Sequence, residues 1–106
     1  MRFVRIINKD KESGVIKSME CFPASNIKQV LIDFMEDENH ERFYCIKITD
    51  TVGTFCIYAT RGEDECFYMF YDFYSWLKDG ESNEFIFTID RSEINNYFKN
   101  CFFKHQ

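Results

Sequence analysis

The segment CFYMFYDFYSWL, residues 66–77, decides the fold because it places seven aromatic rings in twelve positions. At about 100° per residue, a helix would sort this segment into two sides. The apolar side would hold Cys66, Met69, Phe70, Phe73, Trp76 and Leu77. The polar side would hold Asp72, Ser75, Lys78 and Asp79. A strand would instead put Asp72 on the same face as Tyr68 and Phe70, so we predict a helix here.

The residues on both sides of this segment support the helix. Three acidic residues, 63–65, would lie at the positive end of its dipole, and Gly80 fits the position after its last turn. Residues 84–89 then predict a strand, and Asp90 with Glu93 forms a variant of the capping box that opens a last helix. The inward positions of this last helix would be Ile94, Tyr97, Phe98, Cys101 and Phe102.

The first half of the chain predicts two β-hairpins. Residues 3–8 and 15–22 are apolar-rich runs around a polar loop, and Pro23 stops the second run. Residues 43–48 and 54–59 are a second pair of such runs. Aromatic and β-branched residues, which favour strands, are frequent in the second pair. We therefore expect four strands before the aromatic segment.

Another helix is predicted between the two hairpins, over residues 27–35. Asn26 is the N-cap candidate, and Gln29 follows three residues later. Apolar residues recur at i, i+3, i+4, i+7 and i+8, which predicts one buried helix face. These residues are Ile27, Val30, Leu31, Phe34 and Met35. The acidic segment 36–41 would end this helix.

The expected order of elements is therefore ββα-ββα-βα. Hairpins that alternate with helices predict an α+β fold, in which a five-stranded, mainly antiparallel sheet carries helices packed on one face. The 106 residues, 45% of them hydrophobic, suffice for one packed core. We expect residues 1–106 to form a single domain.

Composition also bounds the compartment and the chemistry. The longest apolar run, residues 66–71, is too short to span a bilayer, and no stretch long enough for a secretory signal starts the chain. Five cysteines, which contain no C-x-x-C pair, predict reduced and buried thiols in a cytosolic protein. These are Cys21, Cys45, Cys56, Cys66 and Cys101. We expect a soluble cytoplasmic protein without a membrane partner.

Residues for catalysis or cofactor binding are scarce in this sequence. His40 lies among acidic residues and His105 lies next to the last residue, so neither predicts a general base beside a nucleophile. The spacing of the cysteines does not predict a structural zinc site, although a site shared between Cys45 and Cys56 stays open beside the favoured role in core packing. No phosphate-binding glycine motif occurs. We expect no catalytic residue, no metal and no cofactor, and hence not an enzyme.

Nucleic-acid binding is the alternative function that the strand aromatics suggest. Rings at Phe43, Tyr44, Phe55 and Tyr58 could stack on bases or hold a small ligand. Affinity for nucleic acid rests largely on Lys and Arg, however, and here 13 basic residues face 18 acidic ones, for a formal net charge of -5. A nucleic-acid or small-ligand binding domain is therefore the second hypothesis, and direct nucleic-acid binding is disfavoured.

The acidic segment is the main candidate for contact with another protein. Carboxylates near the C-terminus of a helix oppose its dipole by up to about 1 kcal/mol each, so these residues would be kept against local stability. The simplest explanation is a solvated turn, and the alternative is a negative patch that meets a basic surface. The candidate partner-binding residues are Asp33, Glu36, Asp37, Glu38 and Glu41, with Tyr68 and Tyr71 from the polar side of the aromatic helix.

These features together favour a small acidic protein that acts by stoichiometric binding to a protein partner. The partner would present a basic surface, for example that of a nucleic-acid-binding protein. An inhibitor or immunity-type factor fits this description, and a phage- or mobile-element-encoded anti-defence protein of a low-GC bacterium, such as an anti-CRISPR, is one concrete version. Pairing of the chain with its own copy stays open, because so many rings could leave an aromatic face exposed.

Overall fold

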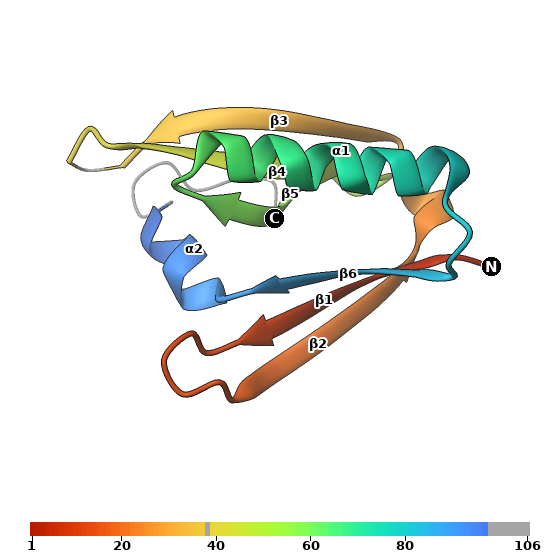
Figure 1. Cartoon of the computed structure of the whole chain (residues 1–106), viewed down its shortest axis with the longest axis horizontal. Coiled ribbons are helices and arrows are strands. Elements are labelled where there is room, and N and C mark those ends of the chain that lie inside the picture. The colour runs from red at the N-terminus through yellow and green to blue at the C-terminus, as the bar shows by residue number, and fades with distance from the viewer. Residues whose placement is uncertain (38, 98–106) are drawn as a thin grey trace.

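The computed structural model describes residues 1–37 and 39–97, which form six strands and two α-helices (Figure 1). The elements are β1 (Phe3–Lys9), β2 (Ile16–Pro23), the short 3-10 helix η1 (Ala24–Asn26), β3 (Gln29–Glu36), β4 (Arg42–Thr49), β5 (Thr54–Thr60), α1 (Glu63–Asp79), β6 (Glu84–Ile89) and α2 (Arg91–Tyr97). The α+β class is confirmed. The single five-stranded sheet and the predicted order of elements are wrong, because the strands form two three-stranded sheets.

The main local correction concerns the predicted helix 27–35, most of which is strand β3. This strand runs antiparallel to β4, from Gln29 opposite Thr49 to Glu36 opposite Arg42. The apolar residues of β3 cover both of its faces, and a strand that is apolar on both faces can imitate helical spacing. The β-branched residues Val30 and Ile32 favour the strand. Antiparallel pairing with β4 over eight residues favours the strand over the predicted helix.

Sheet B consists of β3, β4 and β5 in that order, and all its pairs are antiparallel. Its β4–β5 pair is the predicted second hairpin, which is confirmed. Asp50 closes the hairpin by accepting hydrogen bonds from the backbone N–H of Val52, at 2.7 Å, and of Gly53, at 3.1 Å. β4 is buried on both faces, since Cys45 and Ile46 are both fully covered.

Sheet A consists of β2, β1 and β6 in that order. Its antiparallel β1–β2 pair is the predicted first hairpin, which is confirmed. β6 pairs with β1 in parallel, from Phe3 opposite Glu84 to Asn8 opposite Ile89. A parallel neighbour requires a crossover, and here the crossover contains all of sheet B and α1. The order of elements alone did not predict this pairing.

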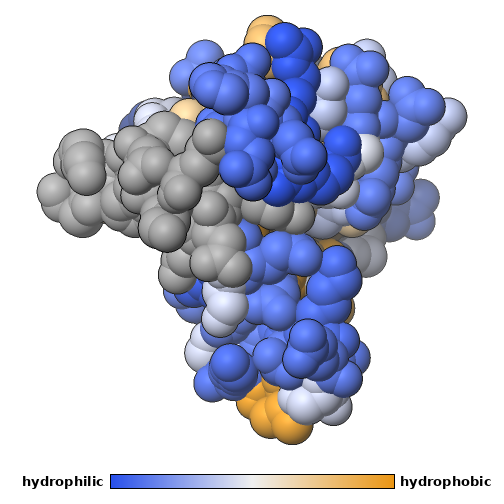
Figure 2. Space-filling model, turned by 90° about the vertical axis from the view of Figure 1, so that its left-hand side faces the viewer, coloured by the Kyte–Doolittle hydropathy of each residue, from blue (hydrophilic) through white to orange (hydrophobic). Residues whose placement is uncertain are grey.

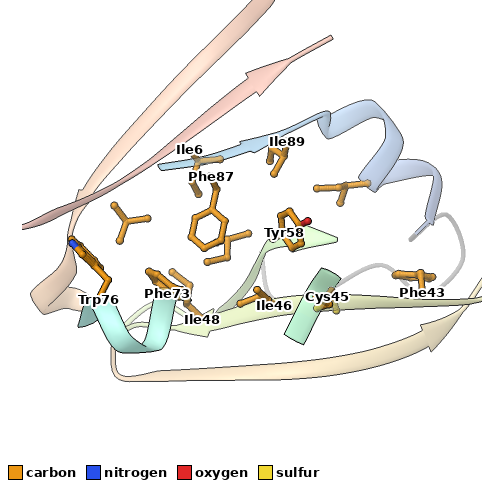
Figure 3. Packing of buried hydrophobic residues seen from close by; sticks show 14 residues of the cluster. Ile6, Phe43, Cys45, Ile46, Ile48, Tyr58, Phe73, Trp76, Phe87 and Ile89 are labelled. Carbon is orange, nitrogen blue, oxygen red and sulfur yellow. The ribbon is translucent and has the colours of Figure 1, made fainter. Parts of the chain in front are cut away.

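The core lies between the two sheets and is closed by α1 (Figure 3). Phe73 of α1 is fully buried, and its ring centroid lies 5.1 Å from that of Phe85 and 5.0 Å from that of Phe87. The ring centroids of Trp76 and Phe85 lie 5.6 Å apart. The predicted aromatic helix is thus confirmed, and Cys66, Phe73 and Trp76 are its buried residues.

The end of α1 is tied to the start of β1. Gly80 donates its backbone N–H to the carbonyl oxygen of Trp76 at 2.9 Å, and a Cβ at Gly80 would overlap Trp76. Glycine is therefore required at position 80 because Trp76 lies so close. Its backbone angle is not the reason, since a φ of -63° suits any residue. The Arg2 guanidinium donates to the carbonyls of Trp76, of Leu77 at 2.6 Å and of Gly80 at 3.3 Å. It also lies 4.5 Å over the Trp76 ring.

The last helix, α2, begins where the sequence predicts it. The Asp90 carboxylate accepts hydrogen bonds from the backbone N–H of Ser92 at 3.0 Å and of Glu93 at 3.3 Å, so it is the N-cap. Ile94 is buried, as expected. The expected inward side chains of Tyr97, Phe98, Cys101 and Phe102 lie outside the described residues. In the part of the chain that the structure describes, neither helix has the length and apolar character needed to cross a membrane.

Candidate functional site

The solvent side of α1 exposes four aromatic rings. Phe67 is 37% exposed, Tyr68 71%, Tyr71 62% and Tyr74 46%. The charged residues exposed among these rings are mostly acidic, with Lys78 as the basic one. We call this surface the helix face, and it consists of Asp64, Phe67, Tyr68, Tyr71, Asp72, Tyr74, Lys78 and Asp79. It combines apolar area with negative charge.

The helix face follows from the spacing of rings in the sequence. Positions 66, 73 and 76 point into the core, and this leaves the rings at other helical angles on the flank or in solvent. Phe70, which is half-buried, stacks on Tyr74 at 6.2 Å between centroids and meets Tyr71 edge-on at 5.9 Å. The exposed rings therefore rest on a ring that packs against the core.

The exposed ring of Phe34 lies on β3, at the edge of sheet B. Phe34 is opposite Tyr44 on β4, and the centroids of the two rings lie 6.5 Å apart.

Cations already lie over two exposed rings, one on β3 and one on α1. The Arg42 guanidinium lies 4.4 Å from the centroid of the Phe34 ring, and the Lys78 ammonium lies 5.6 Å from that of Tyr74. Both distances suit a cation–π interaction. The rings can therefore accept positive groups at their faces, in addition to apolar contacts.

Asp37, one of the predicted partner-binding residues, builds the turn between β3 and β4. Its carboxylate accepts hydrogen bonds from the backbone N–H of Asn39 at 2.8 Å and of Glu41 at 3.0 Å, and from Arg61 at 2.6 Å. The hydrogen bond from Arg61 holds the pKa of Asp37 below its usual value. His40 in this turn has a left-handed φ of 64°. Asp37 thus has a structural role that sequence reasoning missed.

The other predicted acidic residues differ in what they contact. Asp33 lies on β3. Its carboxylate lies 2.9 Å from the Lys47 ammonium and accepts a hydrogen bond from the backbone N–H of Phe34 at 2.9 Å. Glu36 is 3.5 Å from His40, Glu41 is 4.0 Å from Arg61, and both are exposed. Glu38 lies outside the described residues. No helix ends at this segment, so the argument from an opposed helix dipole is wrong.

The structure brings the acidic turn next to the start of the helix that carries the two predicted tyrosines. Arg61 contacts both Asp37 and Glu41 and lies two residues before α1, so the turn adjoins the start of the helix. Tyr68 and Tyr71 both belong to the helix face. Sequence reasoning missed Phe67 and Tyr74, although their helical angles beside Tyr71 could have shown them as exposed.

Two of the four strand aromatics of the second hypothesis are buried. Phe43 is fully buried and Tyr58 is 7% exposed, so their rings cannot stack on bases. Burial, together with a 2.6 Å hydrogen bond to Glu65, raises the pKa of Tyr58 well above its usual range. Tyr44 and Phe55 are half-buried.

The thiols are mostly, but not all, in the core. Cys45 and Cys66 are buried as expected, and Cys56 is half-buried, whereas the expectation of a buried Cys21 is wrong because that residue is exposed on β2. Cys45 and Cys56 hydrogen-bond to each other across β4 and β5, which lowers the pKa of Cys45 and raises that of Cys56. Within residues 1–37 and 39–97, no three side chains of His, Cys, Asp or Glu gather as metal ligands.

A shallow cavity of about 650 Å³ opens at the end of the molecule that carries the β1–β2 loop. Three of its carboxylates serve local structure. Glu65 accepts from Tyr58 and Thr60, Asp90 caps α2, and Asp10 accepts the Ser13 N–H at 2.7 Å. Figure 2 shows mostly hydrophilic residues at this end. These contacts hold the loops together, and the helix face is therefore the stronger candidate for a functional site.

Comparison with protein-family models, curated proteins and solved structures finds no match to this chain.

Proposed function

We propose that this protein acts by stoichiometric binding to a protein partner, with the helix face as the contact surface. The observation that carries the proposal is the row of four rings on α1, each more than one-third exposed. Tyrosine is enriched in protein interfaces because it offers a large rigid area and a polar tip. A cluster of exposed rings on one helix supports a binding surface, since monomers rarely leave such apolar area uncovered.

The charge of the helix face favours a basic partner. Asp64, Asp72 and Asp79 lie among the rings, against the single cation Lys78, and Glu36 and Glu41 lie at the nearby turn. The net charge of -5 would steer a positive surface toward the protein. Arginine or lysine side chains of the partner could lie over the tyrosine rings as Arg42 lies over Phe34.

An inhibitor or immunity-type role follows from this chemistry as part of the proposal. A basic surface on a protein is often the surface that binds nucleic acid, and an acidic, aromatic face can occupy it in place of the nucleic acid. Negative charge would provide the attraction, and the rings would provide the contact area. The protein would then act by occupancy alone, in a fixed ratio to its partner.

The test compares what the immobilised protein captures from a lysate of its source cells. The wild type, Tyr68→Ala/Tyr71→Ala and a control, Val52→Thr in the exposed turn of the β4–β5 hairpin, are used side by side. A protein held by the wild type and the control but lost by the tyrosine variant supports the helix face. An interface tyrosine often contributes about 2 kcal/mol, so the loss of even one of these contacts should lower the affinity about 30-fold. Light scattering of the purified complex then gives its stoichiometry.

The opposite outcome is equally clear. If circular dichroism shows that the tyrosine variant is folded, and it still holds the same protein as tightly as the wild type, the helix face is not the contact surface.

The second hypothesis, nucleic-acid binding, is tested by a mobility shift with single-stranded oligonucleotides at low salt. We expect no shift, because phosphates would meet a negative surface.

A further inference from the structure

Sheet A exposes a second surface, on the face opposite the core. Val4, Ile6 and Phe87 point inward and are buried, so the alternate residues of the same strands point outward. The registers β1–β2 and β1–β6 place the outward residues in three rows. We call this surface the sheet face, and it consists of Phe3, Arg5, Ile7, Met19, Cys21, Glu84, Ile86 and Thr88.

The sheet face is largely apolar and open. Met19 and Ile86 are each 48% exposed, and Cys21 is exposed on β2, in the row of Arg5 and Ile86. Val15 and Ile16 continue the apolar surface at the tip of the hairpin, where Figure 2 shows hydrophobic residues in a hydrophilic surrounding. Among the described residues, β2 pairs with β1 alone, and most of this strand is exposed on both faces.

One ion pair lies across the sheet face. The Arg5 guanidinium of β1 donates to the Glu84 carboxylate of β6, with Nε at 2.9 Å, and both side chains are about one-third exposed. The guanidinium also lies 3.2 Å from the sulfur of Met19. The two charges cancel, so this face is neutral on a molecule that carries a net charge of -5.

We propose that the sheet face packs against the same face of a second copy of this chain. A two-fold axis makes a dimer interface meet itself, so each residue needs a partner within the same patch. The sheet face meets this condition, because Arg5 of one copy can contact Glu84 of the other copy and the reverse. The apolar residues around them then cover each other, as in packed β-sheets.

Charge also argues that the second copy uses the sheet face rather than the helix face. Two helix faces would bring at least three carboxylates of each copy together and repel. Two sheet faces are neutral and complementary. Sheet A contacts α1 through its inner face, that of Phe85 and Phe87, so the sheet face points away from the helix. The dimer would therefore leave both helix faces open to a partner, and it stands or falls independently of the proposed function.

The size of the sheet face sets the expected strength. Three strands about 4.8 Å apart, with outward residues over about 20 Å of length, give a patch of roughly 15 Å by 20 Å on each copy. Two such patches make roughly 600 Å² in total, which is below the roughly 1,000 Å² at which stable specific interfaces start. We therefore expect a weak, reversible dimer with a dissociation constant in the high micromolar range.

Sedimentation over a range of protein concentrations tests the dimer. The wild type should pass from a mass of 12.8 kDa toward twice that value. Ile86→Glu should raise the dissociation constant at least about tenfold, because it adds a like charge to each copy. Tyr71→Glu, a matched change on the helix face, should dimerise as the wild type does. A wild type that stays monomeric, or an Ile86→Glu variant that dimerises normally, would overturn the proposal.

A charge-swap mixture tests the contact itself. Arg5→Glu alone and Glu84→Arg alone each place like charges on the face, so each should weaken its own dimer. Mixed in equal amounts, the two variants should form a heterodimer, since each then meets the opposite charge. A mixture that stays as weak as its components would contradict the contact. If either variant fails to fold, cross-linking of wild-type Cys21 to Cys21 by a short bismaleimide, checked by peptide mapping, gives the answer instead.

Discussion

The helix face and the sheet face both expose apolar side chains, but they differ in charge. The helix face mixes the rings of Tyr68 and Tyr71 with carboxylates. The sheet face surrounds the internal ion pair between Arg5 and Glu84 with aliphatic residues. Our two proposals differ for this reason: we propose a basic protein as the partner of the first surface and a second copy of the chain as the partner of the second.

The two faces share one core, and the largest change should remove both. Phe73 joins α1 to β6 through its contacts with Phe85 and Phe87. Phe73→Ala should lower the free energy of unfolding by about 3–5 kcal/mol, because a fully buried ring is replaced by a cavity. Urea denaturation measures this loss. A change below about 1 kcal/mol would mean that α1 and sheet A do not depend on each other through this ring.

Arg2 connects the start of β1 to the end of α1, and its removal should have the next largest effect on stability. Its guanidinium donates to three carbonyls at the end of α1 and lies over Trp76. Arg2→Ala should cost about 2 kcal/mol of stability through the loss of charged hydrogen bonds. The fluorescence of Trp76, followed during denaturation, reports on it. Arg2→Lys should recover only part of the loss, since lysine lacks the planar fork.

Charge reversal on the helix face should affect binding without affecting stability. Asp72→Lys/Asp79→Lys should weaken binding of a short poly-arginine peptide about tenfold or more. Lysine at the last residue of α1 also suits the helix dipole, so the melting temperature should not fall. The matched control, Glu12→Lys/Glu81→Lys, changes the net charge equally but lies off the helix face. If poly-arginine binding weakens equally in both variants, the binding depends on net charge and not on the helix face.

The smallest predicted effect concerns pH and the acidic turn beside the helix face. Arg61 lowers the pKa of Asp37 in the folded state below the ordinary value of 3.8. The stability that this carboxylate contributes is therefore complete above its unfolded pKa and is lost as the pH falls through the folded pKa. Between about pH 5 and about pH 2, Asp37→Asn should lose less stability than the wild type. Parallel losses in the two proteins would contradict this assignment.

The local elements of the fold were largely predictable, whereas their assembly was not. The aromatic helix, both hairpins and the cap at Asp90 depend on neighbours in sequence, and the structure confirms them. β3 was missed because its apolar residues, which include Val30, Leu31, Phe34 and Met35, also fit the period of a helix. The parallel pairing of β1 with β6 depends on burial of Val4 and Phe87 between two sheets, and sequence order carries no signal of it.

The candidate site was predictable only in part for a related reason. Tyr68 and Tyr71 were found because their helical angle opposes the buried face. The role of Asp37 could not be found, since its contact with Arg61 joins residues 24 positions apart. The sheet face was missed altogether, because alternation within β1 tells that Arg5 and Ile7 share a face but not that β6 completes it.

The most direct test of the division by charge is the salt dependence of the two associations in one preparation. Poly-arginine binding and self-association are followed by sedimentation from about 0.05 M to about 0.5 M salt, a range in which screening of exposed charges rises strongly. Poly-arginine binding should weaken at least about tenfold, whereas the dimer, held mainly by apolar area, should change less than about twofold. Poly-arginine binding that salt leaves unchanged, or a dimer that dissociates along with it, would contradict the account.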